Sequence, residues 1–401
     1  MILHYILAGL AGLSAALMLW QWAVARRFPL HRRIEDKSFT PAVSLLKPMK
    51  GADEHTEACL RSWFEQNYTG PMEILFGAAS PEDPSCAIIR KLMAEFPQRD
   101  ARLIITSHNV GANGKASNLA QLEPHAKYDL IVSSDADVRV PNDFLSNAVA
   151  PLKDEKVGLV NCFYRLANPT TLAMHWEAIA VNADFWSSVL QSASLKPLDF
   201  ALGAVMATRR KQLAEIGGFA ALADCLADDY QLGNRIAKRG HRIELCPVVV
   251  ACWSGKMGWR DVWRHQLRWA RTIRVSQPVP YFFSILANAM LWPLLWLTWG
   301  AHRSSIHLFP GDGADFAMSA CISSELVLVP VFLLLRLLMA WDLQRRLTPN
   351  SNFALLTSYF HLVWLKDLLQ FALWLCAFAG NKVEWRGQWY RLRKDGTLER
   401  K

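Results

Sequence analysis

The chain has 401 residues, of which 52% are hydrophobic, and it carries a formal net charge of +9. This length allows two or three domains. The basic residues gather beside long apolar segments and form no stripe with aromatic side chains. The charge therefore favours contact with anionic lipid headgroups, and we expect no nucleic-acid partner. The eight cysteines form no Cys-x-x-Cys pair, which argues against a zinc site or a disulfide framework and favours a reducing environment.

Three apolar segments predict an integral membrane protein. Residues 1–25 contain no Asp, Glu, Lys or Arg and precede two arginines, residues 279–301 lack the same four residue types, and residues 317–341 contain only two of them. An apolar helix of about 20 residues spans the hydrocarbon core of a bilayer. A cleaved signal peptide is the alternative for the first segment, but its charges follow the apolar run instead of preceding it.

The basic residues that flank these segments predict their orientation. Arg26 and Arg27 place the segment that follows them in the cytoplasm, and Arg345 and Arg346 favour the same side. The expected parts are an N-terminal anchor over residues 1–27, a cytoplasmic domain over 41–275, a membrane domain over 279–380 and a basic cytoplasmic tail over 381–401.

Residues 353–379 are apolar but carry His361, Lys366 and Asp367 in the middle. Charged groups at the centre of a bilayer need buried partners. A third full crossing after residues 279–301 and 317–341 would also place the basic tail outside. We therefore expect residues 353–379 to be re-entrant or interfacial.

Short apolar strands alternate with helices in the segment between the membrane segments. Strands are predicted at residues 41–46, 72–77, 102–106, 130–132, 157–161, 203–207, 242–245 and 248–251, and helices at 55–66, 83–96, 171–197 and 228–238. This alternation is typical of a three-layer α/β sandwich, and residues 130–132 have the composition of a strand buried on both faces of a parallel sheet. The aromatic side chains of residues 171–197 are expected to pack in the core, with contact to lipid as the alternative.

Two carboxylates, Asp135 and Asp137, follow the strand at residues 130–132. Ligands of open α/β sheets bind at the carboxyl ends of the strands. Two like charges this close repel each other unless they share a cation, and Mg²⁺ or Mn²⁺ with oxygen ligands leaves positions open for phosphate oxygens. The pattern therefore predicts a metal that bridges a diphosphate, with a polar turn as the alternative.

Further polar residues follow other predicted strands. Lys47 and Asp53 come after the first strand, where a proline ends the strand and a glycine permits a tight turn. Residues 111–118, which include Lys115 and Asn118, form a glycine-bearing turn before a helix. Such a turn can hold phosphates, although an ordinary start of a helix is the alternative.

Three features of the second half complete the candidate site. The small residues that begin with Gly203 indicate close approach of a ligand or of another part of the backbone. Asp228 and Asp229 open a helix, where capping is the alternative role. Residues 263–269 precede the second apolar segment, and an interfacial helix with basic and aromatic residues is the alternative there.

Taken together, these pieces resemble the membrane-bound ceramide glucosyltransferase family, an inverting branch of the GT-A glycosyltransferases. The matching motifs are residues 43–53, residues 111–119, Asp135-Ala-Asp137, Asp228-Asp229-Tyr230, His265-Gln-Leu-Arg268-Trp269 and the tail from Trp385. The family has Gln or Arg where this chain has His265, so Arg264 or Gln266 could make the contact of that position instead. The chain is also similar to the bacterial hopanoid-biosynthesis glycosyltransferases, which modify a polycyclic lipid alcohol.

The resemblance implies a GT-A domain inserted between N-terminal and C-terminal membrane helices, in a bacterial inner membrane and facing the cytoplasm. A hexose would pass from UDP-glucose or UDP-N-acetylglucosamine to the hydroxyl of a lipid, ceramide or hopanoid. A processive polysaccharide synthase is disfavoured because few spanning segments are available, and a catalytically inactive scaffold is disfavoured because the motif carboxylates are intact.

The resemblance also assigns roles to residues. Asp229 is the expected general base, Arg268 the partner of the diphosphate and Trp269 a wall for the sugar or acceptor. Mg²⁺ or Mn²⁺ is expected on Asp137, with Asp135 on the same metal or near the ribose. The remaining expected substrate-binding residues are Lys47, Asp53, Lys115, Asn118, Gly203, Asp228, His265 and Gln266.

Overall fold

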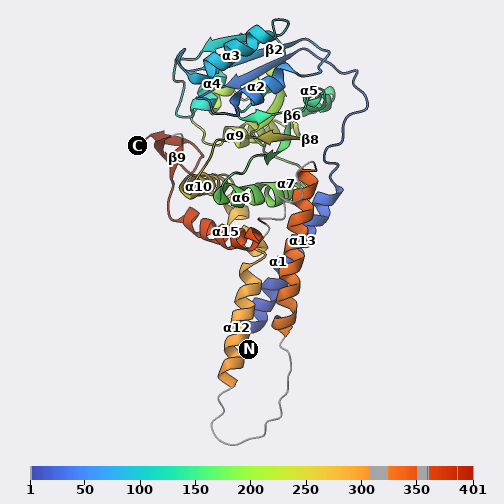
Figure 1. Cartoon of the computed structure of the whole chain (residues 1–401), viewed down its shortest axis with the longest axis vertical. Coiled ribbons are helices and arrows are strands. Elements are labelled where there is room, and N and C mark those ends of the chain that lie inside the picture. Colours follow the sequence, from blue (N-terminus) through green and yellow to red (C-terminus); the bar gives the residue numbers. More distant parts are fainter. Residues whose placement is uncertain (1, 308–323, 350–358, 360, 386, 401) are drawn as a thin grey trace, which may run out of the picture.

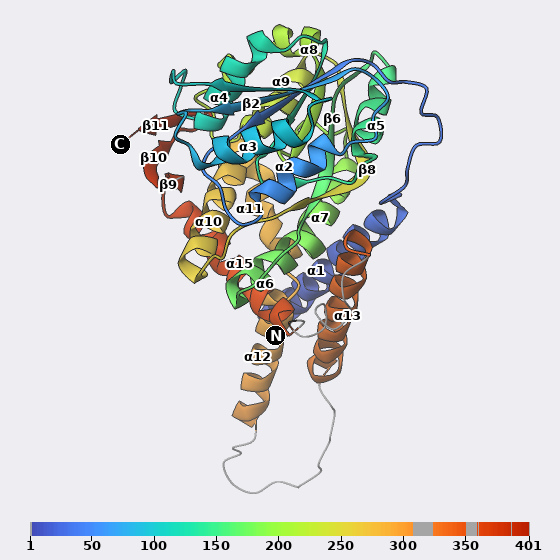
Figure 2. The ribbon, with the colours of Figure 1, turned by 45° about the horizontal axis from the view of Figure 1, so that its top comes forward.

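The computed structural model describes residues 2–307, 324–349, 359, 361–385 and 387–400. An α/β domain forms one end of the molecule, and three helices, α1 (Ile2–Arg27), α12 (Leu291–His307) and α13 (Ser324–Leu347), lie side by side in a stem at the other (Figure 1). The turned view gives the same arrangement (Figure 2). Parts of two predicted membrane segments, residues 317–323 and 353–358, lie outside the described residues.

The domain is built on an eight-stranded sheet. Its strands, in spatial order, are β3 (Asp100–Ile105), β2 (Met72–Ala78), β1 (Val43–Pro48), β4 (Leu130–Ser134), β7 (Val205–Arg209), β6 (Val157–Leu166), β8 (Arg242–Cys252) and β5 (Val138–Arg139). The first four strands are parallel, β7 runs antiparallel to both β4 and β6, β8 is parallel to β6, and β5 is antiparallel to β8.

The predicted α/β sandwich is confirmed, and the parallel pairing expected around residues 130–132 holds toward β1 but is wrong toward β7. The sheet is mixed, because β4 pairs with antiparallel β7 on one side. Burial on both faces gives the same apolar run whichever way the neighbouring strand points. The two strands predicted at 242–251 are also one strand, β8. A register shift against β6 accommodates Pro247, which cannot donate to the ladder.

Helices cover both faces of the sheet, and others lie at the base of the domain against further helices. They are α2 (Thr56–Phe64), α3 (Pro84–Glu95), α4 (Gly114–Leu122), α5 (Phe144–Val149), α6 (Leu172–Ile179), a π-helix over Ala180–Phe185, α7 (Trp186–Ala193), α8 (Arg210–Glu215), α9 (Asp228–Lys238), α10 (Trp259–Ser276), α11 (Pro278–Phe283) and α15 (Leu362–Phe378). Short 3₁₀ turns lie at Glu123–His125, Ala150–Lys153, Phe219–Leu222 and Ser284–Ala287.

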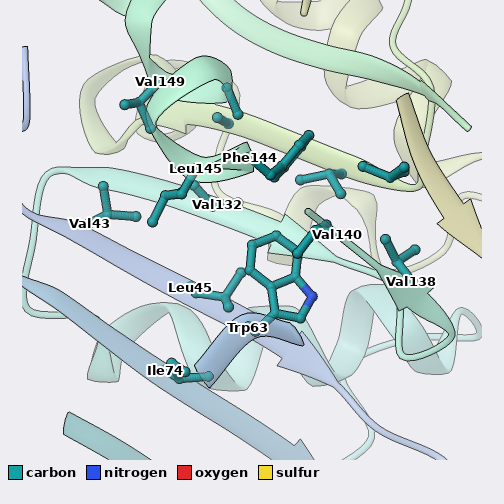
Figure 3. Close-up of a cluster of buried hydrophobic side chains, with 14 of the residues drawn as sticks. Val43, Leu45, Trp63, Ile74, Val132, Val138, Val140, Phe144, Leu145 and Val149 are labelled. Atoms are coloured by element: carbon teal, nitrogen blue, oxygen red, sulfur yellow. The ribbon is translucent and has the colours of Figure 1, made fainter. Parts of the chain in front are cut away.

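Separate apolar cores fill the two faces of the sheet. On one face Trp63 of α2 meets Phe144 of α5 edge to face, with ring centroids 5.8 Å apart, over the side chains of β1 and β4 (Figure 3). On the other face Ile131 packs with residues of α4, α8 and α9, such as Leu232. Burial of these side chains supplies most of the driving force for this layer arrangement.

The described helices include two, Ile2–Arg27 and Glu325–Leu347, that are long and apolar enough to cross a membrane. A third span is possible only if Pro278–Ala287 and Leu291–His302 act together, since they are bent by 47°. The crossing predicted at 279–301 thus falls on two helices with a bend between them, and it stays a prediction. The break has a local cause, because Asn288 Oδ1 accepts hydrogen bonds from the backbone N–H groups of Met290 and Leu291 and starts a new helix there.

The helix α15 lies across the base of the domain, against α6 and α10, and does not run along the stem (Figures 1 and 2). The re-entrant or interfacial arrangement expected for residues 353–379 stays a prediction, and residues 353–358 and 360 lie outside the described residues. The predicted helix at 171–197 is confirmed as the run from α6 to α7. Its tryptophans, Trp176 and Trp186, are fully buried, as expected for core residues.

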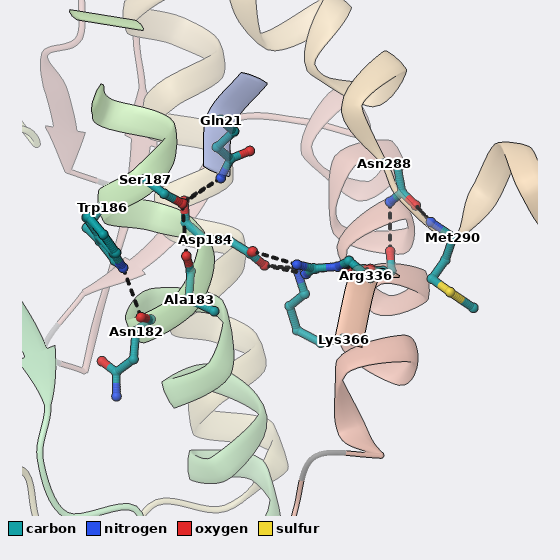
Figure 4. A network of polar contacts seen from close by, with 11 residues as sticks. Gln21, Asn182, Ala183, Asp184, Trp186, Ser187, Asn288, Met290, Arg336 and Lys366 are labelled. Atoms are coloured by element: carbon teal, nitrogen blue, oxygen red, sulfur yellow. Dashed lines mark hydrogen bonds and ion pairs between the residues drawn. The ribbon is translucent and has the colours of Figure 1, made fainter. Parts of the chain in front are cut away.

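A network of four charged residues joins the domain to the membrane helices (Figure 4). Arg336 of α13 contacts Asp367 through Nε at 2.8 Å and Asp184 through Nη1 at 3.0 Å. Lys366 contacts both aspartates. Lys366 and Asp367 therefore both have charged partners, and the four residues of the network come from three separate segments.

The last residues form a second small sheet with the order β11 (Leu398–Arg400), β10 (Gln388–Leu392) and β9 (Lys382–Trp385). It packs on the domain, where Leu226 lies among Val383 and Tyr390 and donates its backbone N–H to the carbonyl of Gly396. The sequence predicted only a basic tail here. The small sheet brings Trp385 and Glu384 to the candidate site.

Candidate active site

The carboxyl end of β4 is held in place by buried contacts. The N–H of Asp135 donates to the carbonyl of Ala204 at 3.1 Å, and the carbonyl of Asp137 accepts from the N–H of Trp253 at 3.0 Å. Lys47 is fully buried and donates to the Ser134 hydroxyl at 3.1 Å and to the Asp135 carbonyl. Burial lowers the pKa of Lys47 to about 8. Lys47 thus positions the strand end, and its contact with a substrate stays a prediction.

Lys115 joins two of the predicted motifs. Its Nζ lies 2.7 Å from Asp135 Oδ1 and 3.3 Å from Asp228 Oδ2. Although burial alone would lower its pKa, the negative charges of these two carboxylates raise the pKa of Lys115 above its usual range. Asn113 caps the same helix start by accepting from the Lys115 N–H at 2.9 Å, and its Nδ2 donates to Asp228 Oδ1. The turn at 111–118 therefore binds Asp228 and also starts α4.

Asp229 points away from this pair and toward Gly203. A Cβ atom on Gly203 would lie 2.7 Å from Asp229 Oδ2, so only glycine leaves room for the carboxylate. The group that closely approaches Gly203 is thus a side chain and not another part of the backbone, while contact of Gly203 with a ligand stays a prediction. The N–H of Tyr230 donates to Asp229 Oδ1 at 2.8 Å. Burial, and then the charge of Asp228, raises the pKa of Asp229 to about 6.

Asp137 carries the other raised pKa of the strand edge. Its side chain is accessible from the pocket, yet the protein surrounds it closely enough that lost hydration, followed by the charge of Asp135, raises its pKa to about 6.

Among the described residues there is no cluster of three or more His, Cys, Asp or Glu that could hold a metal alone. Two adjacent carboxylates still fit Mg²⁺ or Mn²⁺, which take the remaining ligands from a diphosphate and water.

A pocket of about 390 Å³ extends from Asp137 to the C-terminal sheet. It is lined by Asp137, Leu166, Glu177, Cys252, Trp253, Ser254, Met257, Asp261, Arg264, His265, Arg268, Glu384, Trp385 and Gly387. Arg268 and Asp137, which lie far apart in the sequence, therefore share one cavity. Trp269 lies beside this pocket, with its ring centroid 4.4 Å from that of His265 and 6.3 Å from that of Phe185.

The structure adds a residue that the sequence reasoning missed, Glu177 of α6. It is buried, lies 2.6 Å from His265 Nδ1 and accepts a hydrogen bond from Gln266 Nε2 at 2.8 Å. Both motif residues therefore have a common partner. The available signal was a single acidic residue in the otherwise apolar run around Trp176, because a buried carboxyl group needs a compensating contact.

Two other predicted residues stabilise loops of the site. Asp53 Oδ2 accepts from the N–H of Gly255 at 3.0 Å, which ties the loop after β1 to the loop after β8. Asn118 is buried and donates to the carbonyl of Gly77 at 2.8 Å, which holds α4 against β2. Direct contact of either residue with a substrate stays a prediction.

The fold and the carboxylates at the edge of its sheet define a glycosyltransferase fold of the GT-A class. The structure is similar to that of the mannosyltransferase PcManGT from Pyrobaculum calidifontis, which was solved with GDP-Man and Mn²⁺. The TM-score is 0.54 at 22% sequence identity, over 92% of this chain and 99% of that chain. At this identity the likeness shows the fold alone.

Within this class, the model of glycosyl transferase family 21 matches residues 4–398, and the chain belongs to this family. It is 27% identical to ceramide glucosyltransferase 3 of Caenorhabditis elegans over 54% of this chain and 47% of that protein, and 36% identical to the ceramide glucosyltransferase of Candida albicans over 29% and 24%. It is 24% identical to the beta-monoglucosyldiacylglycerol synthase of Trichormus variabilis over 70% and 58%. The matched region thus spans about half or less of the first two relatives.

Proposed function

We propose that this protein transfers a hexose from a UDP-sugar, UDP-glucose or UDP-N-acetylglucosamine, to the hydroxyl of a membrane lipid with inversion at the anomeric carbon. The observation that carries this proposal is the shared pocket. It joins Asp137 at the strand edge to Arg268 on α10, and α10 packs against α15 and α6 at the base of the domain. A lipid whose headgroup enters this pocket can keep its chains in the bilayer beside the stem.

Asp229 is the proposed general base. Its carboxylate accepts the proton of the acceptor hydroxyl while the hydroxyl oxygen attacks the anomeric carbon of the hexose and the bond to the diphosphate breaks. A pKa of about 6 leaves most of Asp229 ionised at neutral pH and keeps it a useful base. Glycine at position 203 leaves room for this carboxylate, which a side chain there would displace.

The leaving diphosphate gains negative charge as this bond breaks. Arg268 lines the pocket and is proposed to bind the phosphate oxygens, because a guanidinium group makes two parallel hydrogen bonds to such oxygens. Asp137 and Asp135 would hold Mg²⁺ or Mn²⁺, which neutralises part of the diphosphate charge when bound. Lys115 keeps Asp135 and Asp228 fixed in this arrangement.

Ceramide is the preferred acceptor because several relatives are named ceramide glucosyltransferase. A polycyclic alcohol of the hopanoid type is the alternative acceptor. We further propose a bacterial inner membrane as the location, with the domain on the cytoplasmic side, because pairs of arginines lie in the last turns of α1 and α13.

The test is to incubate membranes that contain the full chain with a panel of labelled nucleotide sugars and to analyse the lipid extract by mass spectrometry. Membranes without the chain are the control. We expect a lipid that has gained one hexose residue, formed from a UDP-sugar. No labelled lipid with any nucleotide sugar, or products with many sugar residues, would contradict the proposal.

A further inference from the structure

Glu177 lies in the wall of the pocket with only one of its two oxygens paired. The residue is 1% exposed. Its Oε1 accepts from Gln266 Nε2 and lies close to His265 Nδ1, at 2.8 and 2.6 Å. Its Oε2 is buried and has no hydrogen-bond partner among the residues that the structure describes. The helix α10 thus fixes one oxygen of a residue that lines the pocket, and the other oxygen is left without a hydrogen bond.

A buried carboxyl oxygen without a hydrogen bond destabilises a fold, and native proteins leave few such atoms unpaired. Glu177 cannot easily turn to find another partner, because His265 and Gln266 hold the same carboxyl group. A ligand that brings a hydrogen-bond donor into the pocket would remove this penalty. Binding of such a ligand would therefore gain more free energy than a contact made at the solvent-exposed surface.

Glu177 also acts electrostatically on the region of the proposed base. Tyr164 of β6 is half-buried, and its pKa is raised well above the usual value by lost hydration and then by neighbouring charges that include Asp229, Glu177 and Asp135. Charges act over short distances in a protein at physiological salt. Tyr164 is therefore within electrostatic range of both carboxyl groups, Glu177 on α6 and Asp229 on α9.

The lining of the pocket suits a molecule with many hydroxyl groups better than a hydrocarbon chain. Two indole rings, Trp253 and Trp385, are combined with the guanidinium group of Arg268 and the carboxyl groups of Glu177 and Asp261. A hexose presents apolar ring faces to indoles and hydroxyl donors to carboxyl oxygens. A ceramide chain would instead require a continuous apolar wall.

We propose that Glu177 Oε2 accepts a hydrogen bond from a hydroxyl of the hexose in the UDP-sugar, and so selects and orients the donor. This inference rests on the proposed function. In it Glu177 binds substrate, while His265 and Gln266 are positioning residues that hold its other oxygen. It also explains why histidine can occupy position 265, where the family has Gln or Arg, because the side chain at this position has to contact Glu177 Oε1.

The experiment compares the full chain in detergent with Glu177→Gln. The amide keeps a carbonyl oxygen for His265 and Gln266 and replaces Oε2 with a donor group. Glu73→Gln is the matched control, because Glu73 is equally buried but lies on β2 and is bonded by Ser44 and Arg102. The measurements, all with Mn²⁺, are the dissociation constants of UDP, UDP-glucose, UDP-N-acetylglucosamine and deoxyhexose analogues of both sugars, together with the KM for the lipid.

We expect Glu177→Gln to bind UDP as the wild type does and to bind the UDP-sugar about 10- to 100-fold more weakly, as for loss of one hydrogen bond to a charged group. One deoxy analogue should bind the wild type more weakly than the complete UDP-sugar does, by a similar factor. The variant should bind this analogue and the complete UDP-sugar with equal affinity. Glu73→Gln should keep the wild-type ratio of UDP-sugar to UDP affinity.

Three other results would overturn the inference in distinguishable ways. Unchanged donor affinity in Glu177→Gln, with every deoxy analogue bound equally, would show that Oε2 serves the fold or a water molecule. A raised KM for the lipid with unchanged donor affinity would assign Glu177 to the acceptor. Failure of the wild type to bind any UDP-sugar would overturn the proposed function itself.

Discussion

Two groups of buried charges in this protein differ in how completely they are balanced. In the network at the base of the domain, Arg336 and Lys366 face Asp184 and Asp367, and each charged group contacts the opposite sign. Burial alone would raise the pKa of Asp184, but the two cations lower it to about 2.

At the edge of the sheet the balance is different. Four carboxylates, Asp135, Asp137, Asp228 and Asp229, face two lysines, Lys47 and Lys115. The pKa values of Asp137 and Asp229 are raised to about 6. A divalent cation would supply the missing positive charge. The comparison teaches that a balanced buried network stabilises a structure, whereas an unbalanced one indicates a site that binds ligands.

The largest effect, a loss of lipid glycosylation, is expected when the metal is removed from the unbalanced group. With an excess of chelator, or in Asp137→Ala, lipid glycosylation should fall below detection, because the divalent charge that offsets most of the diphosphate charge is then missing. Asp135→Ala should also be severe, since it releases Lys115 as well. The measurement is transfer of labelled hexose, with Mn²⁺ added back to the chelated sample as control. Full activity in excess chelator would contradict the metal site and would show that Asp135 and Asp137 are residues of a polar turn.

Asp229→Asn should lower turnover by about 10²- to 10⁴-fold, because the amide keeps the shape but accepts no proton. Binding of the UDP-sugar should change little. Asp228→Asn is the matched control on the neighbouring residue, and its effect should be milder because Asp228 contacts Lys115 and Asn113 instead. Near-normal turnover in Asp229→Asn would assign the base to another group, with Asp53 to be tested next.

Removal of one charge from the balanced network should act on stability. Arg336→Met leaves two aspartates with one lysine and should destabilise the protein by about 3–5 kcal/mol. The double variant Arg336→Met/Asp367→Leu leaves Lys366 paired with Asp184 and should recover much of the loss. Thermal unfolding in detergent measures both. If the double variant is no more stable than the single variant, the balance of charge is not what holds this network.

Acid should weaken catalysis gradually. A general base works in its ionised form, and the ionised fraction of Asp229 falls as the pH drops through its raised pKa of about 6. Turnover at saturating donor and Mn²⁺ should therefore fall about tenfold for each pH unit below this value. A steeper fall would indicate that protonation of Asp137 contributes, whereas a flat profile down to pH 5 would contradict a base with this pKa.

The smallest effect is expected at His265. His265→Gln should stay within roughly tenfold of the wild type, because an amide can still contact Glu177, whereas His265→Ala should lose more. Arg268→Lys should be poorer than His265→Gln, since an ammonium group cannot make a planar two-pronged contact with phosphate. Wild-type kinetics in His265→Ala would leave Gln266 as the residue that holds Glu177.

The sequence predicted the elements that local composition determines. The strand that ends just before Asp135, the helix that opens at Asp228 and the tight packing around Gly203 were all recognisable from short patterns. The direction of β7 was not, because an apolar run is the same in a parallel and in a mixed sheet. The bend at Asn288 was also hidden, since hydropathy averages over a capping residue.

Contacts between distant segments explain what else was missed at the site. Glu177 lies 88 residues from His265, and no local pattern joins the two. The tail strand that brings Trp385 to the pocket is recognisable as a strand only through its pairing with β10. Lys47 was placed correctly at the strand edge, but its full burial depends on packing that the sequence does not reveal.

The most direct test of the account compares hexosyl-lipid formation by three forms of the full chain in membranes, measured by mass spectrometry with a labelled UDP-sugar. The forms are the wild type, Asp229→Asn from the unbalanced group and Arg336→Met/Asp367→Leu from the balanced one. The account predicts labelled lipid from the wild type and from the double variant, and about 10²- to 10⁴-fold less from Asp229→Asn. Equal product from the wild type and Asp229→Asn, with loss only in a correctly folded double variant, would contradict it.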